Sequence, residues 1–308
     1  MSNKHEQYIV FDEAFIAERK DNYKHTKILK PAVYEVAYDS RNDRTTFSTL
    51  NLHMDEILEL PDSLMKRTIQ LMDQFWSTDL TEKYKLYGLV QKLGILLHGQ
   101  PGTGKTVIMA RIAKRVVEMG GVVLFNPRVD ILANTLKVIR EVEPEKKVVV
   151  LWEEFDSIMH QDESALLCML DGETQVDNIV YLATTNYISK IPARIKNRPS
   201  RFSKVWEIKS PTKAARKSYF EQKIKTDADR EKYVEPLTEA SEGLTIDACK
   251  DLVISVILFG ESISDAVRNI KEINKEHSLG IDDYNEETAK EIFLSTKKPH
   301  KNTLKPLR

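Results

Sequence analysis

The middle of the chain alternates short, wholly apolar runs with longer amphipathic stretches. The apolar runs predict buried strands over 94–98, 122–125, 148–152 and 179–183. The stretches between them have apolar residues at helical spacing, as in 106–119. Strands that are apolar on both faces and joined by helices predict an α/β fold, with a parallel sheet sandwiched by helices.

The pattern changes on both sides of this region. Residues 31–52 alternate around an Asp-Ser-Arg-Asn-Asp turn, which predicts a β-hairpin, and a helix is predicted from Pro61 onward. After Pro211, five stretches have helical spacing with no strand pattern between them, the last over 286–294, so a small all-α lid domain is predicted. Residues 295–308 contain five basic side chains and two prolines and predict a disordered tail.

The predicted organisation therefore has four parts. They are an N-terminal segment with the hairpin (1–60), a large α/β domain (61–210), the helical lid (211–294) and the basic tail (295–308).

Charge and composition exclude several classes of protein. Lys plus Arg (46) and Asp plus Glu (47) nearly cancel, so no overall field points to nucleic acid or a membrane. No apolar run approaches the roughly 20 residues of a membrane span, and the N-terminus lacks the apolar run of a signal peptide. Cys168 and Cys249 lie in apolar helical patterns, which predicts buried free thiols in a reducing compartment. A cytoplasmic protein with no membrane contact is expected.

A glycine-rich turn directly follows the first apolar strand and directly precedes a helix. It matches GxxxxGK[ST], and its residues are Gly99, Gln100, Pro101, Gly102, Thr103, Gly104, Lys105 and Thr106. Such a loop curls its backbone N–H groups around phosphate oxygens. Lys105 can reach the β and γ phosphates, and the Thr106 hydroxyl can bind Mg²⁺. The motif predicts a P-loop NTPase.

The third apolar strand ends in two acids, Glu153 and Glu154. Carboxylates at the carboxyl end of a parallel strand face the crevice where nucleotides bind. We assign Glu153 to the metal and Glu154 to orienting and polarising the attacking water. The other interpretation, an acidic cap between strand and helix, is disfavoured by the P-loop upstream.

Two further polar elements follow along the chain. The fourth strand ends in Thr-Thr-Asn, where the Asn186 amide can hold the water in line, although such a sequence alone is usually a turn. Arg198 and Arg201 flank a proline in a loop expected on the subunit surface. An arginine supplied in trans stabilises transition-state charge in nucleotide hydrolases. A surface salt bridge is the other interpretation.

The order of these motifs resembles the AAA ATPases of the AAA+ superfamily over roughly residues 60–260. Within the family the chain looks most like AAA ATPases encoded by tailed phages, and less like the mitochondrial Rieske-protein translocase group. The resemblance implies a homo-oligomeric ring of about six subunits, with ATP and Mg²⁺ at each interface. A phage-encoded protein would act in the cytoplasm of its bacterial host.

The same resemblance assigns roles to the motifs. It makes Gly99–Thr106 the Walker A loop and the acidic pair the Walker B residues. Asn186 becomes sensor 1, and Arg198 and Arg201 become arginine fingers that reach the neighbour's ATP. Residues 242–248 resemble the second sensing stretch near adenine and ribose. Tyr84, Tyr87 and Gly88 lie where the adenine pocket is usually formed, with packing as the alternative.

The chain also departs from the family pattern. Glu153 stands where the family has Asp, and residues 243–252 contain no arginine for the second sensor. The aromatic–hydrophobic–glycine step of threading proteins is missing between the second and third strands. Arg128 and Ile131 are the candidates left for a pore-facing pair.

Three functions therefore stay open. The favoured one is a ring ATPase that remodels an unidentified protein or assembly. The second is a motor or loader acting on DNA or RNA, for which the basic tail is the main argument. The third is a nucleotide-gated scaffold with little turnover, suggested by Glu153.

Overall fold

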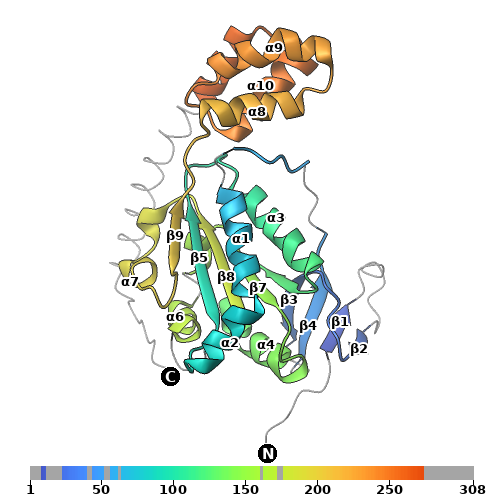
Figure 1. Ribbon diagram of the computed structural model, residues 1–308, viewed down its shortest axis with the longest axis vertical. Coiled ribbons are helices and arrows are strands. Elements are labelled where there is room, and N and C mark those ends of the chain that lie inside the picture. The colour runs from blue at the N-terminus through green and yellow to red at the C-terminus, as the bar shows by residue number, and fades with distance from the viewer. Residues whose placement is uncertain are drawn as a thin grey trace, which may run out of the picture. The chain divides into compact units, whose positions relative to one another are not determined.

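The computed structural model describes residues 8–11, 23–39, 44–51, 56–61, 64–159, 162–171 and 176–273 (Figure 1). The predicted tail and the helix expected over 286–294 lie outside the described residues. The chain forms two compact units. One comprises Met1–Tyr219 with Gly243–Asp247, and the other comprises Phe220–Glu242 with Ala248–Arg308.

The first unit is built on one sheet. Its strands are β1 (Tyr8–Phe11), β2 (Tyr23–Thr26), β3 (Val33–Asp39), β4 (Arg44–Thr49), β5 (Lys92–His98), β6 (Val122–Phe125), β7 (Val148–Trp152), β8 (Ile179–Thr185) and β9 (Lys204–Glu207). The α-helices that begin in this unit are α1 (Leu64–Phe75), α2 (Thr78–Leu86), α3 (Lys105–Glu118), α4 (Val129–Val142), α5 (Phe155–Ile158), α6 (Glu163–Asp171), α7 (Ala193–Lys196), α8 (Lys213–Lys223) and α10 (Ile246–Val253). A 3-10 turn, η2 (Ile188–Lys190), lies between β8 and α7.

The described part of the second unit is helical. It contains α9 (Asp227–Ala240), most of α10, the π-helical turn η3 (Ile254–Leu258) and a further helix over residues 263–273. Helix α9 continues through Pro236 to its end at Ala240. Among the described residues, no helix is both long enough and apolar enough to cross a bilayer.

The strand order is β2-β1-β4-β3-β6-β7-β8-β5-β9. In this order, β6, β7, β8 and β5 pair in parallel, as the apolar runs predict, and β9 adds a further parallel pair with β5. The carboxyl ends of β5, β7 and β8 therefore meet at one edge of the sheet, which brings the loops after residues 98, 152 and 185 together. The fold is that of a P-loop ATPase sheet.

The N-terminal strands extend this sheet. Strands β3 and β4 form an antiparallel hairpin, where the alternation predicts one. The sequence pattern does not predict that β3 also pairs in parallel with β6, through Val33 with Val123 and Tyr34 with Leu124. The buried Tyr34 ring packs edge-on against Phe47, 6.0 Å between centroids, within the same core as α4.

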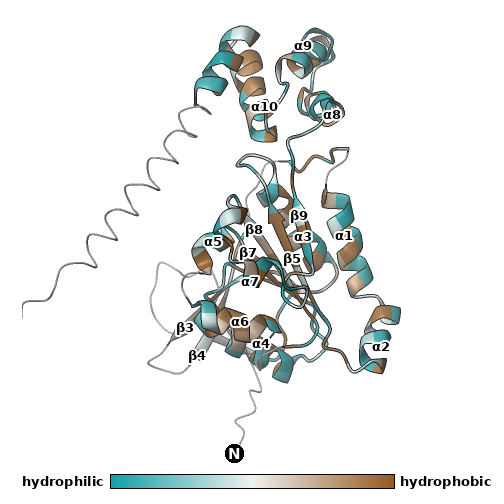
Figure 2. Ribbon diagram, turned by 90° about the vertical axis from the view of Figure 1, so that its left-hand side faces the viewer, coloured by the Kyte–Doolittle hydropathy of each residue, from teal (hydrophilic) through white to brown (hydrophobic). Residues whose placement is uncertain are grey.

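Helices cover both faces of the central strands (Figure 2). Val148, Val150 and Trp152 of β7 pack into the core shared with α4 and α6. Val149 and Leu151 point to the opposite core, shared with α1 and α3. Because side chains alternate along a strand, a strand buried on both faces must be apolar at every position.

One expectation about a side chain is wrong, and one strand was not predicted. Cys249 is buried as predicted, but Cys168 is exposed, because it lies on the solvent side of α6. Strand β9 escaped the sequence pattern because it is an edge strand whose residues alternate between half-buried and exposed. It pairs with β5 from Ile95 to His98.

Candidate functional site

The P-loop is shaped for an anion. Helix α3 begins at Lys105, and its N-cap residue, Gly104, has φ +92 and offers no side-chain cap. The first amides of the helix therefore receive no cap from this residue, and they carry the positive end of the helix dipole. A Cβ added at Gly104 would meet no atom within 4 Å, so the space beside this glycine is open.

Lys105 is buried beside this loop. Its ammonium donates hydrogen bonds to the carbonyl oxygens of Gly99 at 2.8 Å and Gln100 at 2.7 Å. Burial lowers the pKa of Lys105, and the charges of Asp247 and Glu153 oppose that change. The ammonium thus bonds to neutral acceptors, which a phosphate oxygen can replace with a stronger charge-assisted bond.

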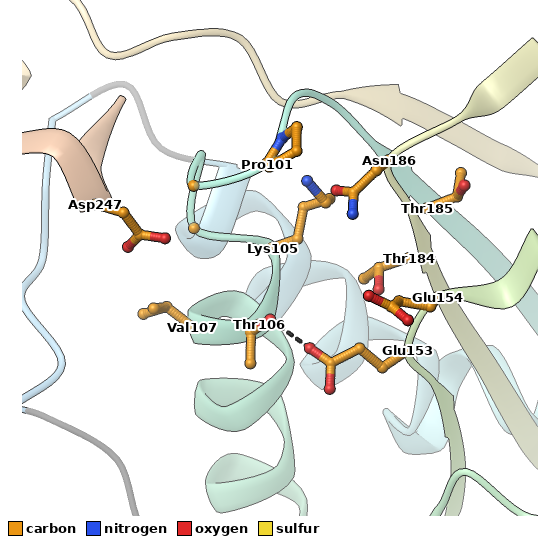
Figure 3. Close-up of a pocket in the computed structure, with 12 residues that line it drawn as sticks. Pro101, Lys105, Thr106, Val107, Glu153, Glu154, Thr184, Thr185, Asn186 and Asp247 are labelled. Atoms are coloured by element: carbon orange, nitrogen blue, oxygen red, sulfur yellow. Dashed lines mark hydrogen bonds between the residues drawn. The ribbon is translucent and has the colours of Figure 1, made fainter. Parts of the chain in front are cut away.

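Glu153 is placed by two contacts from other elements. The Thr106 hydroxyl, on the first turn of α3, donates a hydrogen bond to Glu153 Oε1 (Figure 3). The Glu153 N–H donates to the Asn126 side-chain oxygen at 2.7 Å. Asn126 follows β6 in the left-handed region, at φ 44, a conformation that Asn tolerates better than most residues. The carboxylate predicted for the metal therefore lies next to the predicted hydroxyl ligand.

Glu154 adopts a strained backbone conformation. Its φ of 51 and ψ of 52 place a non-glycine residue in the left-handed region, which costs about 1–3 kcal/mol. Two residues later, the buried Asp156 accepts a 2.6 Å hydrogen bond from the Thr185 hydroxyl. That hydroxyl also accepts the Tyr187 N–H at 2.9 Å. The strained turn after β7 is thus fastened to the end of β8.

One pocket of ≈ 180 Å³ lies at this edge of the sheet. Lys105, Thr106, Glu153, Glu154 and Asn186 all contribute to it, together with Val107, Thr184, Thr185 and Asp247 (Figure 3). The structure therefore brings together the predicted P-loop, acidic and amide residues, although they come from three separate strand ends.

The pocket fits the ATP and Mg²⁺ that the motifs imply. Besides the uncapped α3 and the open space at Gly104, the Asn186 side-chain oxygen is buried and has no hydrogen-bond partner among the described residues. Buried polar atoms without partners are rare unless a ligand or water satisfies them. Thr106 and Glu153 are the residues that would hold Mg²⁺, which supplies positive charge to the phosphates.

The two predicted finger arginines lie apart from this pocket and differ in exposure. The Arg198 side chain is 62% exposed, with a guanidinium nitrogen 3.8 Å from Asp171. The Arg201 side chain is only 6% exposed, and its Nε lies 2.9 Å from Asp171 Oδ2. Its guanidinium also donates to the Arg194 carbonyl. The expectation that the loop presents both arginines at the surface is wrong for Arg201, because Asp171 holds that side chain inside.

The direction of the Asp171 pKa agrees with this ion pair. Burial alone would raise its pKa, but hydrogen bonds from Arg201 and Ser200 hold the pKa below its ordinary value. The Ser200 hydroxyl donates to Asp171 Oδ2 at 3.0 Å. Asp171 is therefore charged and bonded within its own subunit.

The position of the suggested adenine-pocket residues does not fit the structure. Tyr84, Tyr87 and Gly88 precede β5, whereas the P-loop follows it, so a seven-residue strand separates them from the phosphate site by about 20 Å. The packing alternative holds for Tyr84, whose ring lies 6.4 Å from that of Phe75.

The connection between β6 and α4, where the pore-facing pair is predicted, is short. It spans only residues 126–128. Arg128 pairs with Asp130 at its own helix start, and Ile131 is 9% exposed in the core. Ile131 is therefore not available for a pore-facing pair, whereas the Arg128 side chain is 70% exposed.

Sequence reasoning missed two residues that the structure brings beside the site: Asn126 and Asp156. Asn126 follows an apolar strand of the parallel sheet, so its position at the sheet's carboxyl edge was a usable signal. No local signal marks Asp156, because its partner Thr185 is 29 residues away in sequence. Asp247 lies within 242–248, the stretch that the family resemblance places near adenine and ribose, and it lines the pocket.

Comparison with known proteins agrees with this geometry. Residues 95–210 match the family model "ATPase family associated with various cellular activities (AAA)". The matched segment runs from the P-loop strand β5 to just beyond β9. Over these residues the chain is therefore similar to the AAA family, in agreement with the P-loop fold of this part of the chain.

Three curated relatives illustrate the range of similar proteins. The chain is 26% identical over 217 residues to the cell division cycle protein 48 homolog of Archaeoglobus fulgidus, covering 63% of this chain and 29% of the relative. It is 26% identical over 225 residues to the proteasome-activating nucleotidase of Sulfurisphaera tokodaii, covering 64% and 57%. It is 28% identical over 157 residues to the vesicular-fusion protein SEC18 of Candida albicans, covering 41% and 19%. The alignments span less than two thirds of each relative's own length.

Proposed function

We propose that the protein is a ring-forming AAA+ ATPase that hydrolyses ATP and uses the cycle to remodel a protein or a macromolecular assembly. The observation that carries the proposal is the pocket that joins the uncapped P-loop to Glu153, Glu154 and Asn186. A phosphate-binding loop needs neither a strained acidic residue nor a buried orphan amide oxygen. Water activation gives both of them a role.

Each side chain has a proposed task. Lys105 exchanges its loop carbonyls for phosphate oxygens, and the α3 amides hold the phosphate chain. Asn186 accepts a hydrogen bond from the attacking water, and Glu154 orients that water and takes its proton. Thr106 and Glu153 complete the metal side. The longer side chain of Glu153 reaches Thr106 directly, which supports retention of the metal role despite the departure from Asp.

We propose that the arginines act across a subunit interface, in a ring of about six copies. The exposure of Arg198 supports this role. Arg201 can act in trans only after its ion pair with Asp171 is exchanged for a neighbour's phosphate. The phage-like origin and the cytoplasmic location stay predictions.

The three-residue β6–α4 connection favours action on whole folded substrates over threading of an unfolded chain. The names of two relatives, a proteasome-activating nucleotidase and a vesicular-fusion protein, also favour a protein substrate over nucleic acid.

The test is steady-state ATP hydrolysis by the full chain, with sizing in the presence and absence of ATP. Glu154→Gln should retain ATP binding and lose at least about 10²-fold in kcat, because general-base assistance is worth about 10²–10⁴-fold. Asp162→Asn is a matched control, because Asp162 is an acid outside the pocket. Unchanged turnover in Glu154→Gln would refute the assignment.

Stimulation by single- or double-stranded DNA would shift the proposal to a nucleic-acid motor. A nucleotide-dependent ring without turnover would indicate a scaffold.

A further inference from the structure

Strand β8 buries a polar residue at a position where its neighbours on the same face are apolar. Val180 and Leu182 lie in the core shared with α1 and α3, and Thr184 comes next on that face, because side chains alternate along a strand. Thr184 is 2% exposed, and a valine would have nearly the same shape. A buried hydroxyl destabilises the folded protein unless it has a hydrogen-bond partner. The Thr184 hydroxyl therefore needs a partner that a valine would not.

That partner does not come from the described part of the protein. Thr135, another buried threonine, donates to the Ile131 carbonyl at 2.9 Å. The Thr184 hydroxyl, in contrast, forms no hydrogen bond with any described residue. Thr184 lines the pocket instead, on the side of Glu154 and Asn186 (Figure 3). Its partner thus belongs to the contents of the pocket.

The polar groups around Thr184 indicate what that partner is. Asn186 lies two residues further along the chain, no more than roughly 7 Å away between Cα atoms. Its side-chain oxygen is buried and also lacks a partner among the described residues. The last paired residues of β7 and β8 are Trp152 and Ala183, so the turn that carries Glu154 begins beside Thr184. A single water between these three side chains can bond to all of them.

The proposed reaction leaves one position on the attacking water without a partner. The water gives one proton to Glu154 and donates a hydrogen bond with the other to the Asn186 oxygen. One of its two lone pairs attacks the terminal phosphorus. The second lone pair needs a donor, which neither an ionised carboxylate nor an amide oxygen provides, whereas the Thr184 hydroxyl has one O–H to give.

We propose that Thr184 is a further catalytic residue, whose hydroxyl donates a hydrogen bond to the attacking water and holds it in line with the terminal phosphate. This inference rests on the proposed hydrolysis of ATP. In that step the water oxygen bonds to the terminal phosphorus, and the water proton passes to Glu154. The bond from the terminal phosphorus to the bridging oxygen breaks, and the leaving ADP keeps its electron pair. Thr184 retains its own proton and stabilises the negative charge that develops on the water oxygen.

The test compares Thr184→Val and Thr184→Ser with the wild-type full chain. It uses steady-state ATP hydrolysis with Mg²⁺, calorimetric binding of ADP, and urea denaturation without nucleotide. Thr184→Val should lower kcat about 10- to 100-fold, as expected for a misplaced reacting group. The Kd for ADP should stay within about twofold, because ADP lacks the terminal phosphate. The denaturation midpoint should not fall, because the variant removes a hydroxyl without a partner. Thr184→Ser should recover most of the turnover.

Two controls separate a catalytic hydroxyl from a structural one. Thr135→Val removes a buried hydroxyl whose partner lies within α4, so it should lower the denaturation midpoint and leave kcat within about twofold of the wild type. In the Glu154→Gln background, Thr184→Val should cause little further loss of turnover, because residues that act as a unit on one water are not additive.

An unchanged kcat in Thr184→Val, with Glu154→Gln inactive, would overturn this proposal and leave the proposed function intact. A lower kcat together with a lower denaturation midpoint and weaker ADP binding would also overturn it, because that pattern indicates a structural hydroxyl. The same fold loss in the presence and absence of the Glu154 carboxylate would place the effect away from the attacking water. Absence of ATP hydrolysis by the wild type, with no effect of Lys105→Ala on ADP binding, would instead overturn the proposed function itself.

Discussion

Thr185 offers a sharp test of how the catalytic residues are positioned. Its hydroxyl donates to Asp156 at 2.6 Å and accepts the Tyr187 N–H at 2.9 Å, with both side chains of the Thr185–Asp156 pair buried. Thr185 directly precedes Asn186, and Asp156 lies two residues after Glu154. The bond therefore ties the proposed water-holding amide to the proposed base.

Thr185→Val removes the hydroxyl and keeps the shape of the side chain. The free energy of unfolding should fall by about 2 kcal/mol, because a buried hydrogen bond to a charged group is worth about 1.5–3 kcal/mol. The turnover number should fall further. A displacement of about 1 Å at a reacting group can lower the rate about 10²-fold, so we expect a 10- to 100-fold lower kcat.

The assay measures kcat and KM for ATP together with the Kd for ADP. Because the P-loop is untouched, the Kd should stay within about twofold of the wild type, well below the tenfold change that 1.4 kcal/mol would produce. Thr185→Ser keeps the hydroxyl and should recover most of the turnover. A stability loss in Thr185→Val with an unchanged kcat would refute the positioning role and leave the bond purely structural.

Three further predictions test other parts of the site. Subunits with Arg198→Ala, mixed with subunits carrying Lys105→Ala, should regain some ATPase activity, because some interfaces pair an intact arginine with an intact P-loop; no recovery at any ratio would contradict trans action. Asn126→Ala should lower kcat more than ADP affinity, because it frees the N–H of Glu153; equal losses in both would argue against positioning. Asp171→Asn should lower the free energy of unfolding by about 3 kcal/mol at neutral pH, because it leaves a buried arginine without its counter-charge. The lowered pKa of Asp171 stabilises the fold above about pH 4, and this stabilisation is lost as the pH falls through the folded-state value, so denaturation curves of the two proteins should converge only in acid.

The local pattern of apolar residues was sufficient to predict where the central strands lie. Strands β6 and β7 begin and end where the apolar runs over 122–125 and 148–152 predict, because both faces of each strand are buried. Strand β9 was missed because an edge strand with Lys204 and Glu207 at its ends has no such signal. The hairpin of β3 and β4 was predicted from its alternation, but its pairing with β6 depends on contacts about 90 residues apart along the chain.

By itself, the sequence determined the chemistry at each strand end: the phosphate-binding glycines, the acidic pair and Asn186. These residues act through backbone geometry and short spacing, which a linear pattern records. Only the tertiary structure decided what surrounds them. It buried Arg201 against Asp171, fastened the Glu154 turn to Thr185 through Asp156, and set Asp247 against Gly102. Each of these contacts joins residues from different elements, and their energies depend on burial and distance, which exist only once the chain has folded.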